Sequence, residues 1–218
     1  MVGSRLLISS RNYSSWSLRG FLLCRLAGIP FTVQVAAADD PQARAELLSR
    51  SPTFRLPCLL QGEIAVWDTL AIAEHLNEAH PEAQMMPAQR LARARCRSIS
   101  GEMHSGFAAL RASLPLNMRA RRPGFTLWSG PRAYIALIQE IWQECLDTWG
   151  GPWLFGARPS VADAMYAPVA SRFLTYDVAL NPDCAALRDH LLAWPDMAEW
   201  MQEAEQEPEA IEELEVEF

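Results

Sequence analysis

Hydrophobic and polar positions divide the chain into two parts with different periodicities. In the first part, short apolar or alternating runs, typical of strands, are interleaved with stretches whose apolar residues recur at helical spacing. The expected strands cover residues 5–9, 31–36, 57–60 and 64–66, and the expected helices cover 15–27, 42–50 and 68–79. This order, strand–helix–strand followed by a strand hairpin and a helix, predicts a mixed sheet with a parallel half and a hairpin half.

From Ala88 onward only the helical period continues. The expected helices there cover residues 90–112, 131–148, 160–177, 184–192 and 195–204. We therefore expect an α/β domain over residues 1–81, a linker over 82–87 and an all-helical domain over 88–218. The acidic ending, Glu203 through Glu217, is expected to be a solvated, frayed terminus rather than a binding tail.

Composition narrows the class of protein. Half of the 218 residues are hydrophobic, which is enough for a sizeable core, and the net charge of -7 argues against a nucleic-acid partner. No apolar run approaches the roughly 18 residues of a spanning helix, and the first residues lack the features of a signal peptide. We expect no membrane partner and a cytoplasmic location. The five scattered cysteines have no metal-ligand spacing to histidine, so we expect reduced, mostly buried thiols and no metal site.

Polar groups gather at the ends of three expected elements in the first 80 residues. Hydroxyl side chains at residues 13–15 surround the start of the first helix, where unpaired backbone N–H groups favour an anion. Pro57 opens an expected strand, and Asp68 with Thr69 opens the next helix. Each feature also has a purely structural explanation: a serine can cap its helix, the proline can be an ordinary trans proline, and the Asp68 cap is worth about 1 kcal/mol.

The order and spacing of four segments resemble the cytosolic glutathione transferases over the whole chain. Residues 14–19 are similar to the zeta-class Ser-Ser-Cys-x-Trp-Arg segment, and residues 51–59, 68–72 and 160–163 match later motifs of the family. The resemblance implies a thioredoxin-like N-terminal domain followed by an all-helical C-terminal domain, a homodimer, and glutathione as co-substrate. Trp16 stands where the zeta class has cysteine, so the zeta substrate is not carried over.

The resemblance also implies how the thiol would be activated. A free thiol with a pKa of about 8.5 is mostly protonated at pH 7, and a hydroxyl that donates to the sulfur at a helix N-terminus favours the thiolate. Ser14 is the first candidate for this donor because it keeps the register to Arg19, and Ser15 and Tyr13 are the alternatives. One of these hydroxyls is expected to cap the helix instead.

The remaining part of glutathione is assigned to residues of the later motifs. A cis Leu56–Pro57 bond would turn the Leu56 backbone outward, where it can pair with an extended peptide. Thr69 would bind the γ-glutamyl carboxylate at the helix N-terminus, and Asp68 would bind the ammonium group. Arg55 would contact the glycine carboxylate, or is a solvated surface arginine.

The electrophile is expected to lie against the first helix of the second domain and the loop after it. The candidates are Met103, His104, Phe107, Met118 and Arg119, although a methionine and aromatic pattern also fits an ordinary core. Ser160 and Asp163 are expected to form a structural capping pair. The predicted function is a detoxifying transferase in which the thiolate attacks a small electrophile. The alternatives are a glutathione-dependent isomerase or reductase, and a non-catalytic scaffold.

Overall fold

A four-stranded mixed sheet forms the N-terminal part of the computed structural model, which describes residues 3–36, 45, 48 and 55–208. The sheet order is β2-β1-β3-β4, with β1 parallel to β2, β3 antiparallel to β1, and β4 antiparallel to β3. The parallel half and the hairpin half predicted from the sequence are thus confirmed. The strands are β1 (Ser4–Ile8), β2 (Phe31–Val35), β3 (Cys58–Gln61) and β4 (Ile64–Trp67). The helix expected over 42–50 and the Ser51–Pro52 start of the second motif fall largely outside the described residues.

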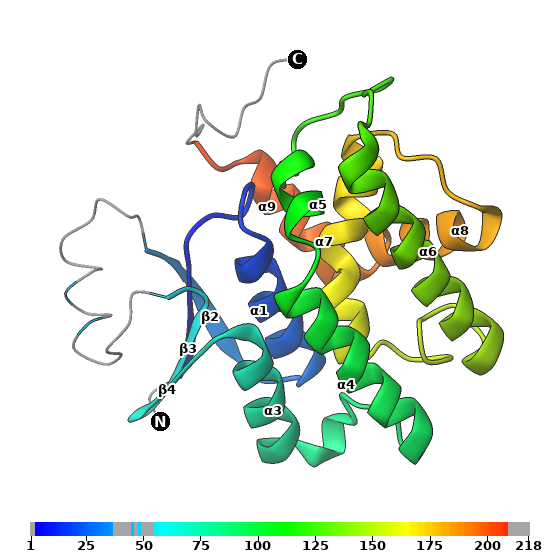
Figure 1. Ribbon diagram of the computed structural model, residues 1–218. Helices are drawn as coiled ribbons and strands as arrows, with labels where there is room; N and C mark the ends of the chain where they lie inside the picture. The colour runs from blue at the N-terminus through cyan, green and yellow to red at the C-terminus, as the bar shows by residue number, and fades with distance from the viewer. Residues whose placement is uncertain (1–2, 37–44, 46–47, 49–54, 209–218) are drawn as a thin grey trace.

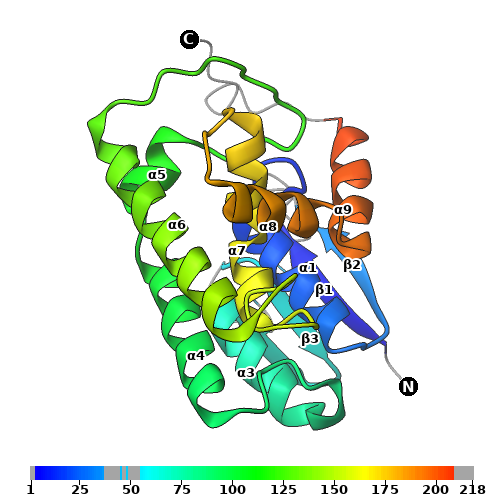
Figure 2. The ribbon, with the colours of Figure 1, turned by 90° about the vertical axis from the view of Figure 1, so that its right-hand side faces the viewer.

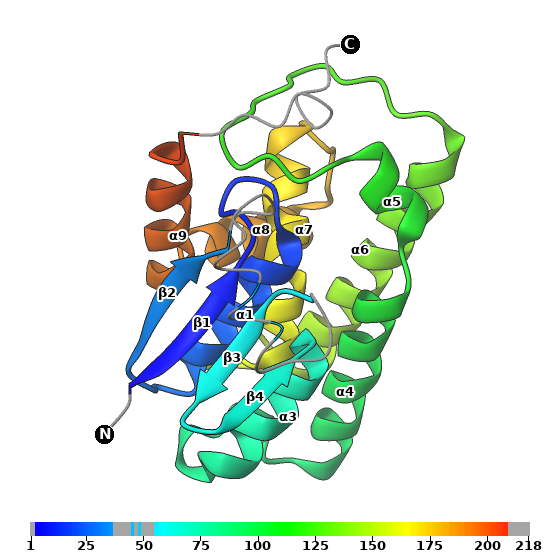
Figure 3. The same ribbon diagram turned by 90° about the vertical axis from the view of Figure 1, so that its left-hand side faces the viewer.

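Two helices of this part, α1 (Ser15–Leu26) and α3 (Thr69–Ala79), cover the sheet face that looks toward the helical part (Figures 1 and 3). Helix α1 is buried on nearly every side because the sheet packs against one face and α7 against another. Its sequence agrees with this position, since Leu18, Phe21 and Leu22 have almost no exposed surface. The start of α1 therefore lies at the boundary between the two parts of the chain.

The rest of the described chain is helical. It consists of the short 3-10 helix η1 (Pro81–Ala83), α4 (Arg90–Ser105), α5 (Ala108–Ser113), α6 (Ser129–Trp149), α7 (Val161–Thr175), α8 (Pro182–Leu192) and α9 (Pro195–Glu205). The prediction of one helix over residues 90–112 is wrong. The chain breaks there at Gly106 and Phe107, and Phe107 has a positive φ of 57°. A Cβ on Gly106 would lie 2.7 Å from the Glu102 carbonyl oxygen, so the turn between α4 and α5 requires glycine.

Helix α7 occupies the centre of the helical part, with α4, α6 and α8 around it (Figure 2). Its start carries the expected capping box: the Ser160 backbone N–H donates to Asp163 Oδ2 over 2.8 Å. The buried side chains of α7 join those of α1 and the sheet in one hydrophobic cluster. The N-terminal and helical parts therefore share a continuous core.

The C-terminal helix α9 packs beside α1, at the edge of the sheet where β2 lies (Figure 3). The expectation of a frayed acidic terminus is wrong for Glu203 and Glu207, because both carboxylates bond to the loop between β1 and α1. All five cysteines are buried, as expected, and burial raises the pKa of the Cys24 thiol to about 12. Within the described ranges, no helix has the length and apolar character needed to cross a bilayer.

Candidate functional site

A cleft of about 430 Å³ lies where the N-terminal part meets α4. All five residues that the sequence assigns to glutathione binding line it, together with Trp16 from α1 and two residues from α4. The lining residues are Trp16, Arg55, Leu56, Pro57, Asp68, Thr69, His104 and Ser105. The folded chain thus brings together the ends of α1, β3 and α3, which the sequence could only place separately.

The floor of the cleft near β3 is set by close packing of Pro57 on helix α1. The Leu56–Pro57 bond is cis, as expected. A Cβ added at Gly20 would lie 2.8 Å from Pro57 Cγ, so only glycine lets the helix approach the proline this closely. Arg55, just before this turn, is exposed on the rim of the cleft.

Asp68 begins helix α3 as its N-cap. Its Oδ1 accepts the Leu70 N–H over 2.9 Å and the Ala71 N–H over 3.4 Å, which confirms the capping role predicted for this position. The other oxygen, Oδ2, lies 3.1 Å from His104 Nε2. One carboxylate therefore caps the helix and also contacts a side chain of the helical part.

His104 connects α4 to the start of α3. Its Nδ1 lies 3.4 Å from Thr69 Oγ1, so the two ring nitrogens contact the two residues assigned to the γ-glutamyl group. The ring also meets Trp16 edge-on, with centroids 5.0 Å apart. Sequence reasoning placed His104 on the electrophile side and did not foresee this position, because no local pattern joins α4 to α3.

The hydroxyl side chains at the start of α1 each accept a protein hydrogen bond. Ser14 Oγ accepts the Ser17 N–H over 3.2 Å as the N-cap, and Ser15 Oγ accepts from Arg172 Nη2 over 2.8 Å. An accepting hydroxyl still carries a proton to donate, so both serines can donate to an anion. These serines adjoin Trp16 in the chain but are not among the residues that line the cleft.

The third hydroxyl, that of Tyr13, accepts from Arg119 Nη2 over 3.1 Å. The guanidinium of Arg119 also lies over the Tyr13 ring, 5.8 Å from its centroid, and Arg119 Nη1 donates to the Glu207 carbonyl over 2.8 Å. Both side chains therefore belong to a contact between the β1–α1 loop and the C-terminal part of the chain. Tyr13 is largely buried in this contact.

Three arginines gather behind the first turn of α1. Burial, followed by repulsion from Arg172 and Arg111, lowers the pKa of Arg19 to about 9. Burial also lowers the pKa of Arg172 to about 10, again with repulsion from Arg111. Both values leave the guanidinium groups charged at pH 7, so this cluster adds positive charge near the α1 N-terminus. Only Arg19 was part of a recognised motif, and nothing in the local sequence indicates Arg172.

Most of the side chains expected on the electrophile side lie elsewhere. Met103, Phe107 and Met118 are at most 3% exposed and belong to the hydrophobic core. Arg119 is engaged with Tyr13 and the C-terminal segment, as described above. Of the five candidates, His104 alone lines the cleft. Over the described ranges, no three His, Cys, Asp or Glu side chains are grouped so that they could hold a metal ion.

Comparisons with known proteins agree with this architecture. Residues 13–79 match the family model of the glutathione S-transferase N-terminal domain, and residues 101–203 match that of the C-terminal domain. Maleylacetoacetate isomerase of Rattus norvegicus is 25% identical over 175 residues, which is 79% of each chain.

Two solved structures have the same fold. A glutathione transferase homolog from Burkholderia gl BGR1, with bound glutathione, has a TM-score of 0.72 at 18% identity and covers 94% of this chain and 100% of its own. Maleylacetoacetate isomerase from Anaeromyxobacter dehalogenans 2CP-1, with glutathione in its active site, has a TM-score of 0.65 at 23% identity. The match covers 96% of this chain and 98% of the isomerase chain. The two family models together span most of the chain, and the chain belongs to the glutathione S-transferase family.

Proposed function

We propose that the cleft binds glutathione and that a serine at the start of α1 activates its thiol. The observation that carries this proposal is the convergence of Leu56, Asp68 and Thr69 on one cleft that is also lined by Trp16 from the first turn of α1. The peptide would pair with Leu56, and the γ-glutamyl end would meet the N-terminus of α3. His104, which contacts both Asp68 and Thr69, would adjoin that end of the ligand.

Thiolate formation follows from the charge around the α1 N-terminus. The helix dipole, the nearby arginines and a donated serine hydroxyl each favour the anionic sulfur over the neutral thiol. Ser14 remains the first candidate because this residue is half-buried, whereas Ser15 is only 6% exposed. Ser15 is the alternative, since Arg172 occupies its acceptor side and leaves its proton to be donated elsewhere.

Two reactions can use the same thiolate. In a conjugation the sulfur stays bonded to a small electrophile and glutathione is consumed. In an isomerisation the sulfur adds to the substrate and leaves again, so glutathione is regenerated. The similarity to maleylacetoacetate isomerase favours the second reaction as an alternative, although this chain has Trp16 at the zeta-class cysteine position. Loss of glutathione in step with product indicates conjugation, and constant glutathione indicates isomerisation.

The first test is a calorimetric titration with glutathione, combined with the ultraviolet absorbance of the bound thiolate as pH is varied. We expect binding at millimolar concentration or below, with a thiol pKa at least one unit under its usual value of about 8.5, or about 1.4 kcal/mol. Ser14→Ala should return the thiol pKa toward that value, and Ser15→Ala should do so if it is the donor instead.

A matched control is Ser98→Ala, because Ser98 is exposed on α4 and its hydroxyl donates to the Ala94 carbonyl of its own helix. No heat with glutathione in the folded wild-type protein would contradict the proposal and favour a non-catalytic scaffold. The homodimer implied by the family is a further expectation, which light scattering of the purified protein would test.

A further inference from the structure

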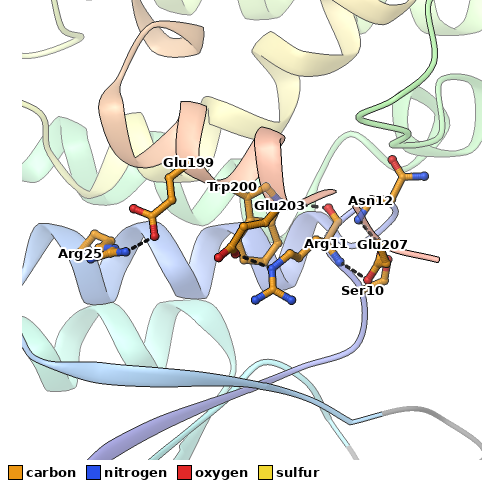
Figure 4. Close-up of polar contacts among 8 residues, drawn as sticks. All are labelled: Ser10, Arg11, Asn12, Arg25, Glu199, Trp200, Glu203 and Glu207. Atoms are coloured by element: carbon orange, nitrogen blue, oxygen red, sulfur yellow. Dashed lines mark hydrogen bonds and ion pairs between the residues drawn. The ribbon is translucent and has the colours of Figure 1, made fainter. Parts of the chain in front are cut away.

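The carboxylate of Glu207 holds the loop between β1 and α1 (Figure 4). Its Oε2 accepts the Ser10 hydroxyl and the Asn12 backbone N–H, each over 2.8 Å, and its Oε1 accepts the Arg11 backbone N–H over 2.9 Å. Three donors of one short loop thus converge on one carboxylate. Hydrogen bonds to an ionised acceptor are about twice as strong as those between neutral groups, so this contact can fix the loop conformation.

Two side chains of α9 extend this contact, and we call Trp200, Glu203 and Glu207 the C-terminal clamp. The indole N–H of Trp200 donates to the Arg11 carbonyl over 3.0 Å, and Glu203 Oε2 accepts from Arg11 Nε over 2.6 Å. Trp200 is completely buried, with its ring 5.0 Å from that of Phe21 in α1. The clamp therefore engages the loop through both its backbone and its side chains (Figure 4).

Ser10 of this loop connects the clamp to the residues at the start of α1. Ser10 donates to Glu207, and its Oγ accepts the Tyr13 backbone N–H over 3.0 Å. Tyr13 is followed directly by Ser14, the N-cap of α1. The position of Ser10 therefore fixes the backbone immediately before the candidate donor.

We propose that Glu207 is a positioning residue for thiol activation: it fixes the β1–α1 loop so that Ser14 and Ser15 face the sulfur. This inference rests on the proposed function for the role of the serines, whereas the clamp itself rests on the contacts described above. Without the carboxylate, the N–H groups of Arg11 and Asn12 lose their acceptor, and the loop can leave the conformation that presents the serines.

Glu207→Gln is the decisive variant because glutamine has nearly the same shape but offers only one acceptor oxygen. Its amide N–H₂ would face either the Arg11 N–H or the Asn12 and Ser10 donors, so a donor would oppose a donor. The matched control is Glu205→Gln, which makes the same charge change at an exposed position of α9. Circular dichroism and amide exchange in α7 show that each variant is folded.

We expect amide hydrogen exchange at residues 11 and 12 to become at least tenfold faster in Glu207→Gln and to stay unchanged in Glu205→Gln. We also expect the pKa of the thiol of bound glutathione, measured by thiolate absorbance, to rise by half a unit or more in Glu207→Gln and to stay unchanged in Glu205→Gln. A side chain that only stabilised the fold would lower the melting temperature without moving this pKa.

Two results would overturn the inference: unchanged exchange in the loop, or faster exchange with an unchanged thiol pKa. Failure of the proposed function has a different signature, since the folded wild-type protein would then give no heat with glutathione. The exchange measurement needs no glutathione, so it decides whether Glu207 holds the loop even in that case.

Discussion

Asp163 has no exposed surface, and its carboxylate accepts three hydrogen bonds from the protein. Oδ1 accepts the Leu154 N–H over 3.0 Å, and Oδ2 accepts the N–H and the hydroxyl of Ser160 over 2.8 and 2.7 Å. Burial raises the pKa of this carboxyl to about 6 although these bonds act in the opposite direction. Asp163 therefore connects the loop at Leu154 to the start of the central helix, and it is not among the residues that line the cleft.

The raised pKa predicts a defined pH dependence of stability. Between the unfolded value of about 4 and the folded value of about 6, the folded protein binds more protons than the unfolded chain, so this contribution to stability is lost as pH rises through about 6. Relative to Asp163→Asn, the free energy of unfolding of the wild-type protein should fall by up to about 3 kcal/mol between pH 4 and pH 7. Urea unfolding of both proteins across this pH range checks the prediction. It is contradicted if the free energy of unfolding of the wild-type protein, relative to that of Asp163→Asn, stays constant or rises between pH 4 and pH 7.

Residues in short motifs could be placed from the sequence, and residues that act across the fold could not. Asp68, Ser160 and Asp163 were foreseen as caps because a cap depends on neighbours within a few positions. Arg172 bonds to a serine 157 residues away, and Glu207 to one 197 residues away, so no local pattern indicates either contact.

At the scale of elements, the approach of α1 to the turn before β3 sets the shape of the cleft. The helix can lie against Pro57 only because position 20 has no side chain. A proline ring cannot rotate away as a flexible side chain can, so a Cβ there must displace either the helix or the turn.

Gly20→Ala should therefore destabilise the protein by about 1–3 kcal/mol, the usual cost of overpacking, and weaken glutathione binding severalfold. Gly101→Ala is the matched control, because a Cβ at that position of α4 meets no atom within 4 Å. The control should gain up to about 1 kcal/mol from helix propensity and leave binding unchanged. Urea unfolding and calorimetry measure both effects, and equal behaviour of the two variants would show that Pro57 yields to the extra atom.

Helical and strand periodicity predicted most elements to within a few residues, and it failed where the period continues through a turn. Apolar residues keep helical spacing across Gly106 and Phe107, so the sequence suggested one helix where the structure has α4 and α5. The break depends on a positive φ at Phe107, a residue type that rarely adopts this conformation.

At the scale of the molecule, the two parts of the chain are joined by a continuous core and by buried polar bonds. Arg19 Nε of α1 donates to the Met165 carbonyl of α7 over 2.9 Å, and Arg172 of α7 donates to Ser15 of α1. These bonds replace water around groups that would be costly to bury alone. The division of the chain into two domains joined by residues 82–87 stays a prediction. Because of the shared core, we do not expect the N-terminal part and the helical part to unfold separately.

A single cooperative transition is the expected result of urea denaturation. Far-UV circular dichroism reports mainly on the helical part, while amide hydrogen exchange in β1 and β3 of the wild-type protein reports on the first part. Loss of the circular dichroism signal and of the exchange protection of the strands at the same urea concentration supports one folding unit. Loss of the exchange protection of the strands at a lower urea concentration would mean that the N-terminal part opens while the helical part remains folded.

The bond between Ser10 and Glu207 also has a consequence for the order in which the protein matures during synthesis. Ribosomes make the chain from its N-terminus, so the serine-bearing loop emerges long before its carboxylate partner. The sheet and α1 can begin to pack earlier, but the bonds that hold the loop cannot form until Glu207 has been made and has left the ribosome. Under this order the loop before Ser14 is held only after α9 and Glu207 have docked, so its ordering comes later in folding than that of the sheet.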